Sequence, residues 1–352
     1  MRRFARDGIF VLHLLWAGIV HAQSMLSATL SGQVRDAASN GPLASVNVFL
    51  ANTMLGCQTD AQGLFEIRNV PFGTHDLVVS LLGYEVQRLE VRITSEHVTI
   101  PLFRLLSKPL QGPEVEVVAE EAEAWRKDLR KFEEFFWGRS KFVAHCKILN
   151  PEVLDFAHDE NHWFTATASE PLQIANRALG YRIHLILTNF EYHERRNEIR
   201  YSLIPHFEPL QPENPAQEQL WRRNRLKAYR GSMRHFLHAL AAQRTNEEGF
   251  EIYTLPTLPW QQHTKRHLLT KPERLLAPGE LPTERRLSFE DYLEIVFAGD
   301  REKTSWMTTS SQAVVMNIAG YVYSGRDLFV YGSWFHQRLA EALPREYAPP
   351  EE

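Results

Sequence analysis

The sequence predicts a multidomain protein, with an all-β sandwich near the N-terminus and an α+β domain after it. The chain has 352 residues, which is long enough for two ordinary domains. From residue 29 to residue 104, short apolar runs alternate with turn residues at roughly 8–12-residue intervals, a spacing typical of a β-sandwich. From residue 119 to residue 344, helical and strand-like patterns are mixed, so we expect an α+β domain there.

The strands of the sandwich are expected at 45–50, 63–68, 76–82, 86–93 and 97–103. Apolar and polar side chains partly alternate in these runs, as in a half-buried strand. In the turn before the second run, Asp60 should close an Asx-type turn, Gly63 should take a positive φ, and Phe65 should begin the next buried strand. Gly83 and Tyr84 should separate the two strands on either side of them.

The turn residues and strand starts of this region also resemble a known family. The residues that carry the resemblance are Ser31-Gly32-Gln33-Val34, Gly41-Pro42-Leu43-Ala44-Ser45-Val46-Asn47-Val48, Thr59-Asp60-Ala61-Gln62-Gly63-Leu64-Phe65, Pro71-Phe72-Gly73 and Gly83-Tyr84. Together they resemble the carboxypeptidase-regulatory-like domain, a prealbumin-like (transthyretin-like) sandwich of bacterial envelope proteins. In the enzymes that gave the domain its name it is an accessory unit, so the resemblance implies no peptidase activity.

The first residues have the pattern of an export signal rather than of a folded element. Arg2, Arg3 and Arg6 precede an apolar run from Ile9 to Val20, and Val20-His21-Ala22 fits a cleavage site. We therefore expect a signal peptide at 1–22 and a short leader at 23–28. No later apolar run is long enough to cross a bilayer. The expected location is the periplasm, the outer-membrane surface or the cell surface.

A linker and one strand are expected at 105–118, and a frayed tail at 345–352. The α+β domain between them should begin with a helix over 120–138, in which Trp125, Leu129, Phe132 and Phe136 form one apolar stripe. From residue 141 onward the chain resembles the downstream region of secreted Bacteroidetes-type proteins that carry the same N-terminal domain. The residues that carry this resemblance include Cys146–Phe156, Pro171–Asn176, Tyr229–Leu237 and Glu248–Phe250. That resemblance brings no known reaction with it.

Further elements of the α+β domain follow from local patterns. Strands are expected at 163–168, 181–189, 199–205, 292–297, 304–308, 313–318 and 328–331. One helix, or a pair of helices broken near Gly231-Ser232, should begin at Asn214-Pro215 and run to about residue 243. The stretch 254–288 has no clear period and is expected to be an extended crossing segment. A last helix is expected over 333–343, with Ser232 and Ser333 as N-caps of their helices.

One basic patch is a candidate binding surface. Arg223, Lys227, Arg230 and Arg234 are spaced by four, three and four residues, so they would share one face of a continuous helix. Such a face could meet an acidic glycan, lipopolysaccharide phosphates or an acidic protein partner. A solvated helix face is the alternative interpretation, and it is the more common one.

His158, Asp159 and His162 are the weak candidates for metal ligands, because His158 and His162 could share a helix face. The residues around them read instead as two strands joined by a polar turn, which favours a solvated hairpin tip. The His-x-x-Glu pair of a metallocarboxypeptidase and the Gly-x-Ser-x-Gly pattern of a serine hydrolase are both missing. No cofactor is predicted. Cys57 and Cys146 could pair in an oxidising compartment, or remain two separate thiols.

These observations favour a non-catalytic binding or assembly module of the cell envelope. The formal charge of −4 excludes a strong overall attraction to nucleic acid. The expected partner is an envelope or outer-membrane protein, or a glycan, because sandwich edges and loops are common recognition surfaces. Two alternatives remain open. One is an envelope hydrolase with its site in the α+β domain, and the other is a carbohydrate-binding module, which an exposed aromatic platform would support.

Overall fold

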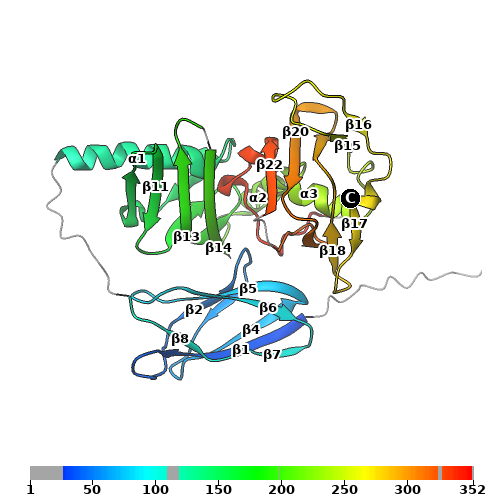
Figure 1. The fold of residues 1–352 in the computed structure, drawn as a ribbon. Coiled ribbons are helices and arrows are strands. Elements are labelled where there is room, and N and C mark those ends of the chain that lie inside the picture. The colour runs from blue at the N-terminus through cyan, green and yellow to red at the C-terminus, as the bar shows by residue number, and fades with distance from the viewer. Residues whose placement is uncertain (1–26, 109–118, 197, 324–326, 351–352) are drawn as a thin grey trace, which may run out of the picture.

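The computed structural model describes residues 27–108, 119–196, 198–323 and 327–350 (Figure 1). The expected signal peptide at 1–22, most of the leader at 23–28 and the strand expected at 114–118 lie outside these residues. Figure 1 shows three parts. The blue and cyan sandwich lies below, and a green sheet and an orange sheet lie side by side above it. Among the described residues, no helix is both long and apolar enough to span a membrane.

The N-terminal part is the β-sandwich that the sequence predicts. One sheet contains β1 (Ser27–Asp36), β4 (Leu64–Pro71), β7 (His97–Thr99) and β8 (Phe103–Leu105). The other contains β2 (Asn47–Leu50), β3 (Gly56–Gln58), β5 (Gly73–Ser80) and β6 (Gln87–Ile93). The run expected at 97–103 is two short strands, and β1 and β3 were not expected. Buried aliphatic side chains of both sheets form the core between them.

The turn at Asp60 has the predicted geometry. The Asp60 Oδ1 atom accepts hydrogen bonds from the backbone N–H groups of Gln62, at 2.9 Å, and Leu64, at 2.8 Å. Gly63 has a φ of +71°, and a Cβ atom there would lie 2.4 Å from the Val34 carbonyl oxygen. Only glycine fits this position without strain. Phe65 then begins the buried side of β4 and is 4% exposed.

The next part is a six-stranded sheet covered on one face by α1 (Ala119–Trp137). Its strands are β9 (Cys146–Ile148), β10 (Leu154–His158), β11 (Trp163–Ala168), β12 (Leu172–Asn176), β13 (Tyr181–His193) and β14 (Glu198–Pro209). The predicted stripe of α1 supplies the core contact: the Phe132 ring lies 4.7 Å from that of Phe190 and 5.9 Å from that of Phe156. Gly138, with a φ of +81°, ends the helix as expected.

The third part combines α2 (Pro215–Tyr229) and α3 (Met233–Ala241) with two further sheets. The five-stranded sheet has the order β16 (His267–Leu268), β15 (Phe250–Leu255), β19 (Tyr292–Phe297), β20 (Asp300–Thr309) and β22 (Leu328–Gly332). The three-stranded sheet contains β17 (Leu276–Pro278), β18 (Glu284–Leu287) and β21 (Val314–Asn317). The segment 254–288 is therefore not simply extended, because it contributes strands to both sheets. Single-turn 3-10 helices lie at Val143–His145, Pro151–Val153, Pro272–Leu275 and Leu339–Glu341.

Two expectations about helix ends have opposite outcomes. Ser232 caps α3 as predicted, because its Oγ atom accepts from the His235 N–H at 3.1 Å. The helix expected over 333–343 is wrong: α4 (Ser333–His336) is a single turn, and Gln337 leaves it to pair with Gly138. Ser333 is not its N-cap. Gly332 holds that position without a side-chain cap, and the Trp334 N–H donates instead to Ser305 Oγ at 3.1 Å.

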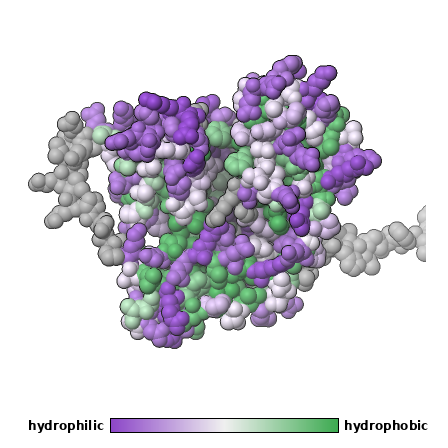
Figure 2. All heavy atoms as spheres, viewed as in Figure 1, coloured by the Kyte–Doolittle hydropathy of each residue, from purple (hydrophilic) through white to green (hydrophobic). Residues whose placement is uncertain are grey.

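The sandwich docks on the rest of the chain through the outer face of β2 and β5. Phe49, Ala51 and Val78 form a buried cluster with Ile186 of β13 and Ile204 of β14. The loop after β2 also pairs with β14, because Asn52 N–H donates to the Pro205 carbonyl at 2.7 Å and the Phe207 N–H donates to the Thr53 carbonyl at 2.9 Å. On the face in Figure 2, hydrophobic residues gather over the sandwich and its boundary with the upper part.

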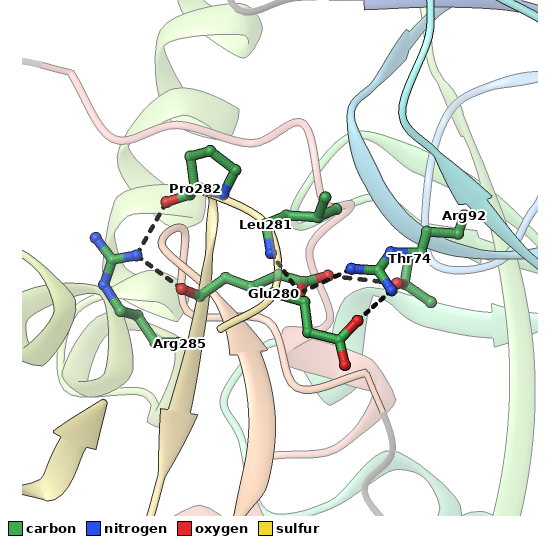
Figure 3. A network of polar contacts seen from close by, with 7 residues as sticks. Thr74, Arg92, Glu280, Leu281, Pro282 and Arg285 are labelled. Atoms are coloured by element: carbon green, nitrogen blue, oxygen red, sulfur yellow. Dashed lines mark hydrogen bonds and ion pairs between the residues drawn. The ribbon is translucent and has the colours of Figure 1, made fainter. Parts of the chain in front are cut away.

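A second contact joins β6 to the hairpin between β17 and β18 (Figure 3). Arg92 of the sandwich pairs with the Glu280 carboxylate and lies 3.9 Å from Glu284 Oε2. Glu284 is only 4% exposed, and it accepts hydrogen bonds from the Leu281 N–H at 3.1 Å and Thr74 Oγ1 at 3.5 Å. A buried carboxylate needs such partners, so this hairpin and the sandwich depend on one another.

Residues 344–347, which we call the C-terminal clasp, make the third contact. The expectation of a frayed tail from residue 345 is wrong here, because Arg345 Nη1 donates to the Thr74 carbonyl at 3.2 Å and Glu346 Oε1 accepts from the Met54 N–H at 3.0 Å. Arg234 holds the clasp from the other side. Its guanidinium donates to the carbonyl oxygens of residues 344, 345 and 347 at 2.9, 2.7 and 2.7 Å.

Candidate functional site

The expected basic face of Arg223, Lys227, Arg230 and Arg234 does not form, because α2 ends at Tyr229. Gly231 has a φ of +80° and lies against the Phe297 ring, so the chain turns before α3 begins. Arg234 is on α3, half-buried, and committed to the clasp. Arg223, Lys227 and Arg230 are exposed. That these three meet an acidic ligand stays a prediction.

His158, Asp159 and His162 lie at the tip of a hairpin formed by β10 and β11. Asp159 Oδ1 accepts from the Trp163 N–H at 2.8 Å, and His162 has a φ of +65°, so both shape the turn. His158 Nε2 lies 3.1 Å from Asp128 Oδ1 on α1. In the part of the chain that the structure describes, no three His, Cys, Asp or Glu side chains are grouped to hold a metal ion.

The two cysteines are free thiols on different parts of the molecule. Cys57 is on β3 of the sandwich and Cys146 is on β9. Burial raises the pKa of the Cys57 thiol and raises that of Cys146 to about 12. Because the thiolate is the reactive form, neither environment activates a nucleophile.

The outer face of the five-stranded sheet carries the most unusual set of side chains. Its inner face packs on α3 through residues such as Ile252, Ile295 and Met307. Directly opposed residues share a face of an antiparallel sheet. One outer row across four strands is therefore Tyr253, Glu294, Trp306 and Tyr331. In a second row on the same face, Tyr292 lies two residues before Glu294 on β19, and Thr308 pairs with Phe329 of β22. We call these two rows, together with Trp260 of the loop after β15, the aromatic face.

Trp260 is the most exposed member of the aromatic face. The loop that carries it is anchored by Leu258, which is 2% exposed, whereas Trp260 is 58% exposed. Its ring stands edge-on to two others, with centroids 5.1 Å from Trp306 at 89° and 5.9 Å from Tyr331 at 62°. These contacts hold the indole in place while much of its surface meets water. A fixed and exposed aromatic ring is a typical feature of a binding surface.

A polar network runs through the centre of the aromatic face. Glu294 is 5% exposed, accepts from Trp306 Nε1 at 3.0 Å, and pairs with Arg266. The Arg266 guanidinium lies 4.0 Å from the Tyr253 ring centroid, and the hydrogen bond to Glu294 raises the pKa of Arg266 above its ordinary value. The Tyr253 hydroxyl donates to Glu251 Oε2 at 2.8 Å.

This arrangement offers open ring surfaces beside fixed hydrogen-bonding groups. The Arg266 side chain is 46% exposed and uses one terminal nitrogen on Glu294, so further N–H groups face solvent. Ligand sites commonly combine aromatic surface with a few oriented polar groups. The sequence does not place these Trp and Tyr residues on one platform, because their common face depends on the register of four strands.

Comparison with known proteins identifies the N-terminal domain. Residues 30–117, about a quarter of the chain, match the model of the CarboxypepD_reg-like domain. No curated protein matches the chain.

Solved structures match part of the chain at low identity. A mutant type II cohesin–X-dockerin complex from Acetivibrio cellulolyticus is 17% identical over 29% of this chain and 71% of that one, with a TM-score of 0.22. Klebsiella pneumoniae 5-hydroxyisourate hydrolase is 20% identical over 23% and 91%, with a TM-score of 0.20. A putative carbohydrate binding protein from Bacteroides uniformis is 10% identical over 46% and 60%, with a TM-score of 0.20. The β-sandwich at the start of this chain is thus a carboxypeptidase-regulatory-like domain, as its strand and turn residues predict.

Proposed function

We propose that this chain is an exported, non-catalytic binding protein of the cell envelope, and that the aromatic face is its contact surface for a glycan. The single observation behind the proposal is the row Tyr253, Glu294, Trp306 and Tyr331, with Trp260 standing over it. A sugar ring has one apolar C–H surface and several hydroxyl groups. The aromatic face offers both kinds of complement within one sheet.

The energetics favour a ligand at this surface. An exposed indole leaves a large apolar area in water, and covering it is favourable by about 25 cal/mol per Å². The Glu294 carboxylate and the Arg266 guanidinium are already oriented by their mutual pair and by Trp306. The exposed Arg266 N–H groups would lose little conformational freedom when sugar hydroxyl groups replace the water around them.

The sandwich has a separate role in this proposal. Its β2–β5 face is covered by β13 and β14, so a protein partner in the envelope would meet the other sheet, which contains β1, β4, β7 and β8. That sheet has β4 as an edge strand, and Leu64 on β4 is 49% exposed. Edge strands are recognition surfaces because their backbone groups are available for pairing.

The test is binding of purified residues 23–352 to a panel of polysaccharides, followed by calorimetry with the best soluble oligosaccharide. Trp260→Ala should weaken binding roughly tenfold, which corresponds to about 1.4 kcal/mol, because the most accessible stacking surface is lost. Trp163→Ala is the matched control, since Trp163 is a partly exposed indole on the distant β11 and should leave affinity unchanged. Absence of binding to every glycan, or equal loss in both variants, would overturn the proposal.

A further inference from the structure

A second feature is a cavity of about 560 Å³ that lies away from the aromatic face. It is bounded by the last turn of α1, by β13 and β14, and by the short segment around α4. Its walls include Phe135, Tyr192 and Ile199, while Arg139, His336 and Arg338 line it as well. The cavity therefore combines apolar walls with basic groups from two distant parts of the sequence.

The backbone holds those basic groups together. The Arg139 N–H donates to the His336 carbonyl at 3.0 Å, and Gly138 pairs with Gln337. Gly138 has a φ of +81°, and a Cβ atom there would lie 2.3 Å from the His336 carbonyl oxygen. This close approach requires glycine. It fixes the end of α1 against the segment that carries Arg338.

Arg338 is a half-buried cation whose partners are neutral. Its guanidinium donates through Nε to the Phe335 carbonyl at 3.2 Å and through Nη1 to the Phe135 carbonyl in the last turn of α1. These bonds cap the helix end, whose partial negative charge favours a cation. They leave the second terminal nitrogen for another acceptor. Burial lowers the pKa of Arg338, and the nearby Arg139 lowers it further.

The two guanidinium groups repel one another and lack a counter-ion. No ion pair joins Arg139 or Arg338 to a carboxylate among the residues that the structure describes. His336 adds a third basic group, and its pKa is lowered by burial and by the same two arginines. Arg139 is exposed but Arg338 is half-buried, and uncompensated charge in a partly buried position is unfavourable, so an anion beside Arg338 would stabilise the fold.

The other residues that line the cavity indicate which chemical groups it can hold besides an anion. The Phe135 and Tyr192 rings stack with centroids 3.9 Å apart, which gives the cavity a flat aromatic wall. Glu133 and Glu134 also border the cavity, and burial raises the pKa of the Glu133 carboxyl group. Arginine is not among the groups that act on Glu133, so the carboxyl group stands apart from the two guanidinium groups.

We propose that this cavity binds an amphiphilic organic oxyanion. A carboxylate or phosphate head group would be held by Arg139 and Arg338, and its apolar body would lie along Phe135, Tyr192 and Ile199. Guanidinium groups suit both head groups because their N–H donors match two oxygen atoms at once. The cavity is separate from the aromatic face, so this proposal does not depend on the glycan proposal.

The experiment is calorimetry of residues 23–352 with octanoate, with octyl phosphate and with the uncharged 1-octanol. Both anions should bind more tightly than octanol, and the tighter of the two identifies the preferred head group. Arg139→Gln should weaken anion binding at least tenfold, because it removes one guanidinium and leaves the helix cap intact. Arg130→Gln, at an exposed position within α1, is the matched control and should change nothing.

Trp260→Ala serves as a second control, since it alters the other surface and should leave octanoate binding as in the parent chain. The proposal is overturned if neither anion binds, if octanol binds as tightly as the anions, or if Arg139→Gln and Arg130→Gln behave alike. Near-UV circular dichroism of each variant checks that its tertiary packing is retained.

Discussion

Two outer sheet faces of this molecule carry apolar side chains, and they differ in what covers them. The outer face of β2 and β5 presents Phe49 and Val78, which the chain itself buries against Ile186 and Ile204. The outer face of the five-stranded sheet presents Trp and Tyr residues, and Trp260 there is 58% exposed. Phe and Val have no polar atoms and suit permanent burial, whereas Trp and Tyr tolerate water. The first face is a structural contact, and the second has the character of a surface for a ligand.

Removing one aromatic ring from each face tests whether the two faces differ in their contribution to stability. Phe49→Ala should lower the free energy of unfolding by about 3–4 kcal/mol, because it leaves a cavity between the sandwich and β14. Trp260→Ala should cost less than about 1 kcal/mol, since its ring is largely exposed already. Urea unfolding followed by circular dichroism measures both. Similar losses in the two variants would show that the faces do not differ in kind.

A second pair of variants compares Arg234 and Arg223, which the sequence predicts on one helix face, by their effect on stability. Arg234→Ala should lower stability by about 2–3 kcal/mol, because three clasp carbonyl groups lose their charged donor. Arg223→Ala, on the exposed side of α2, should stay within about 0.5 kcal/mol of the parent. The midpoint of urea unfolding is the readout. An equal effect of both substitutions would contradict the structural role given to Arg234.

The docking of the sandwich should also depend on pH. Burial lowers the pKa of His75 to about 4, with a further contribution from the Arg345 charge, and burial beside His184 lowers the pKa of His206 to about 4. Both values lie below the ordinary 6.5, so the unfolded chain takes up protons first. Stability is therefore full above pH 6.5 and falls as the pH drops towards 4.

The expected loss is about 3 kcal/mol for each histidine across that range. Unfolding measured from pH 7 to pH 4 should show it, and His75→Gln should flatten the curve. His97→Gln is the control, since His97 is exposed on β7 of the sandwich. An unchanged pH dependence in His75→Gln would exclude His75 as a source of the effect.

The sandwich was largely predictable because its signals are local. Alternating apolar residues and the turn at Asp60 to Gly63 define strands within a few residues of one another. The strand β1 escaped prediction because Ser, Thr, Gly and Gln occupy half of its positions, and its pairing with β4 is set by the rest of the sheet. The break between α2 and α3 near Gly231 was predicted, but the spacing of the basic residues continues across it, so Arg234 was wrongly placed on one face with Arg223, Lys227 and Arg230.

The clasp and the aromatic face could not be predicted from local sequence patterns, because both depend on residues that are far apart in the sequence. The Met54 N–H and Glu346 are 292 residues apart in sequence, and nothing in a short Pro- and Glu-containing tail indicates that contact. The aromatic face requires the registers of β15, β19, β20 and β22 together, and a shift of one residue would turn Trp306 to the inner side. Sequence patterns located β19, β20 and β22 but not β15, and they did not give the alignment of these strands.

The position of the clasp at residues 344–347 affects the order in which the parts of the molecule fold and dock. A chain is synthesised from its N-terminal end, so the sandwich can fold long before residues 344–347 exist. Its contacts with Thr74, Asn52 and Met54 can only close when the clasp arrives. A product cut short before Pro344 would carry a folded sandwich on an unfastened remainder. Loss of these few residues would thus leave the contacts between the sandwich and the rest of the molecule open to proteolysis.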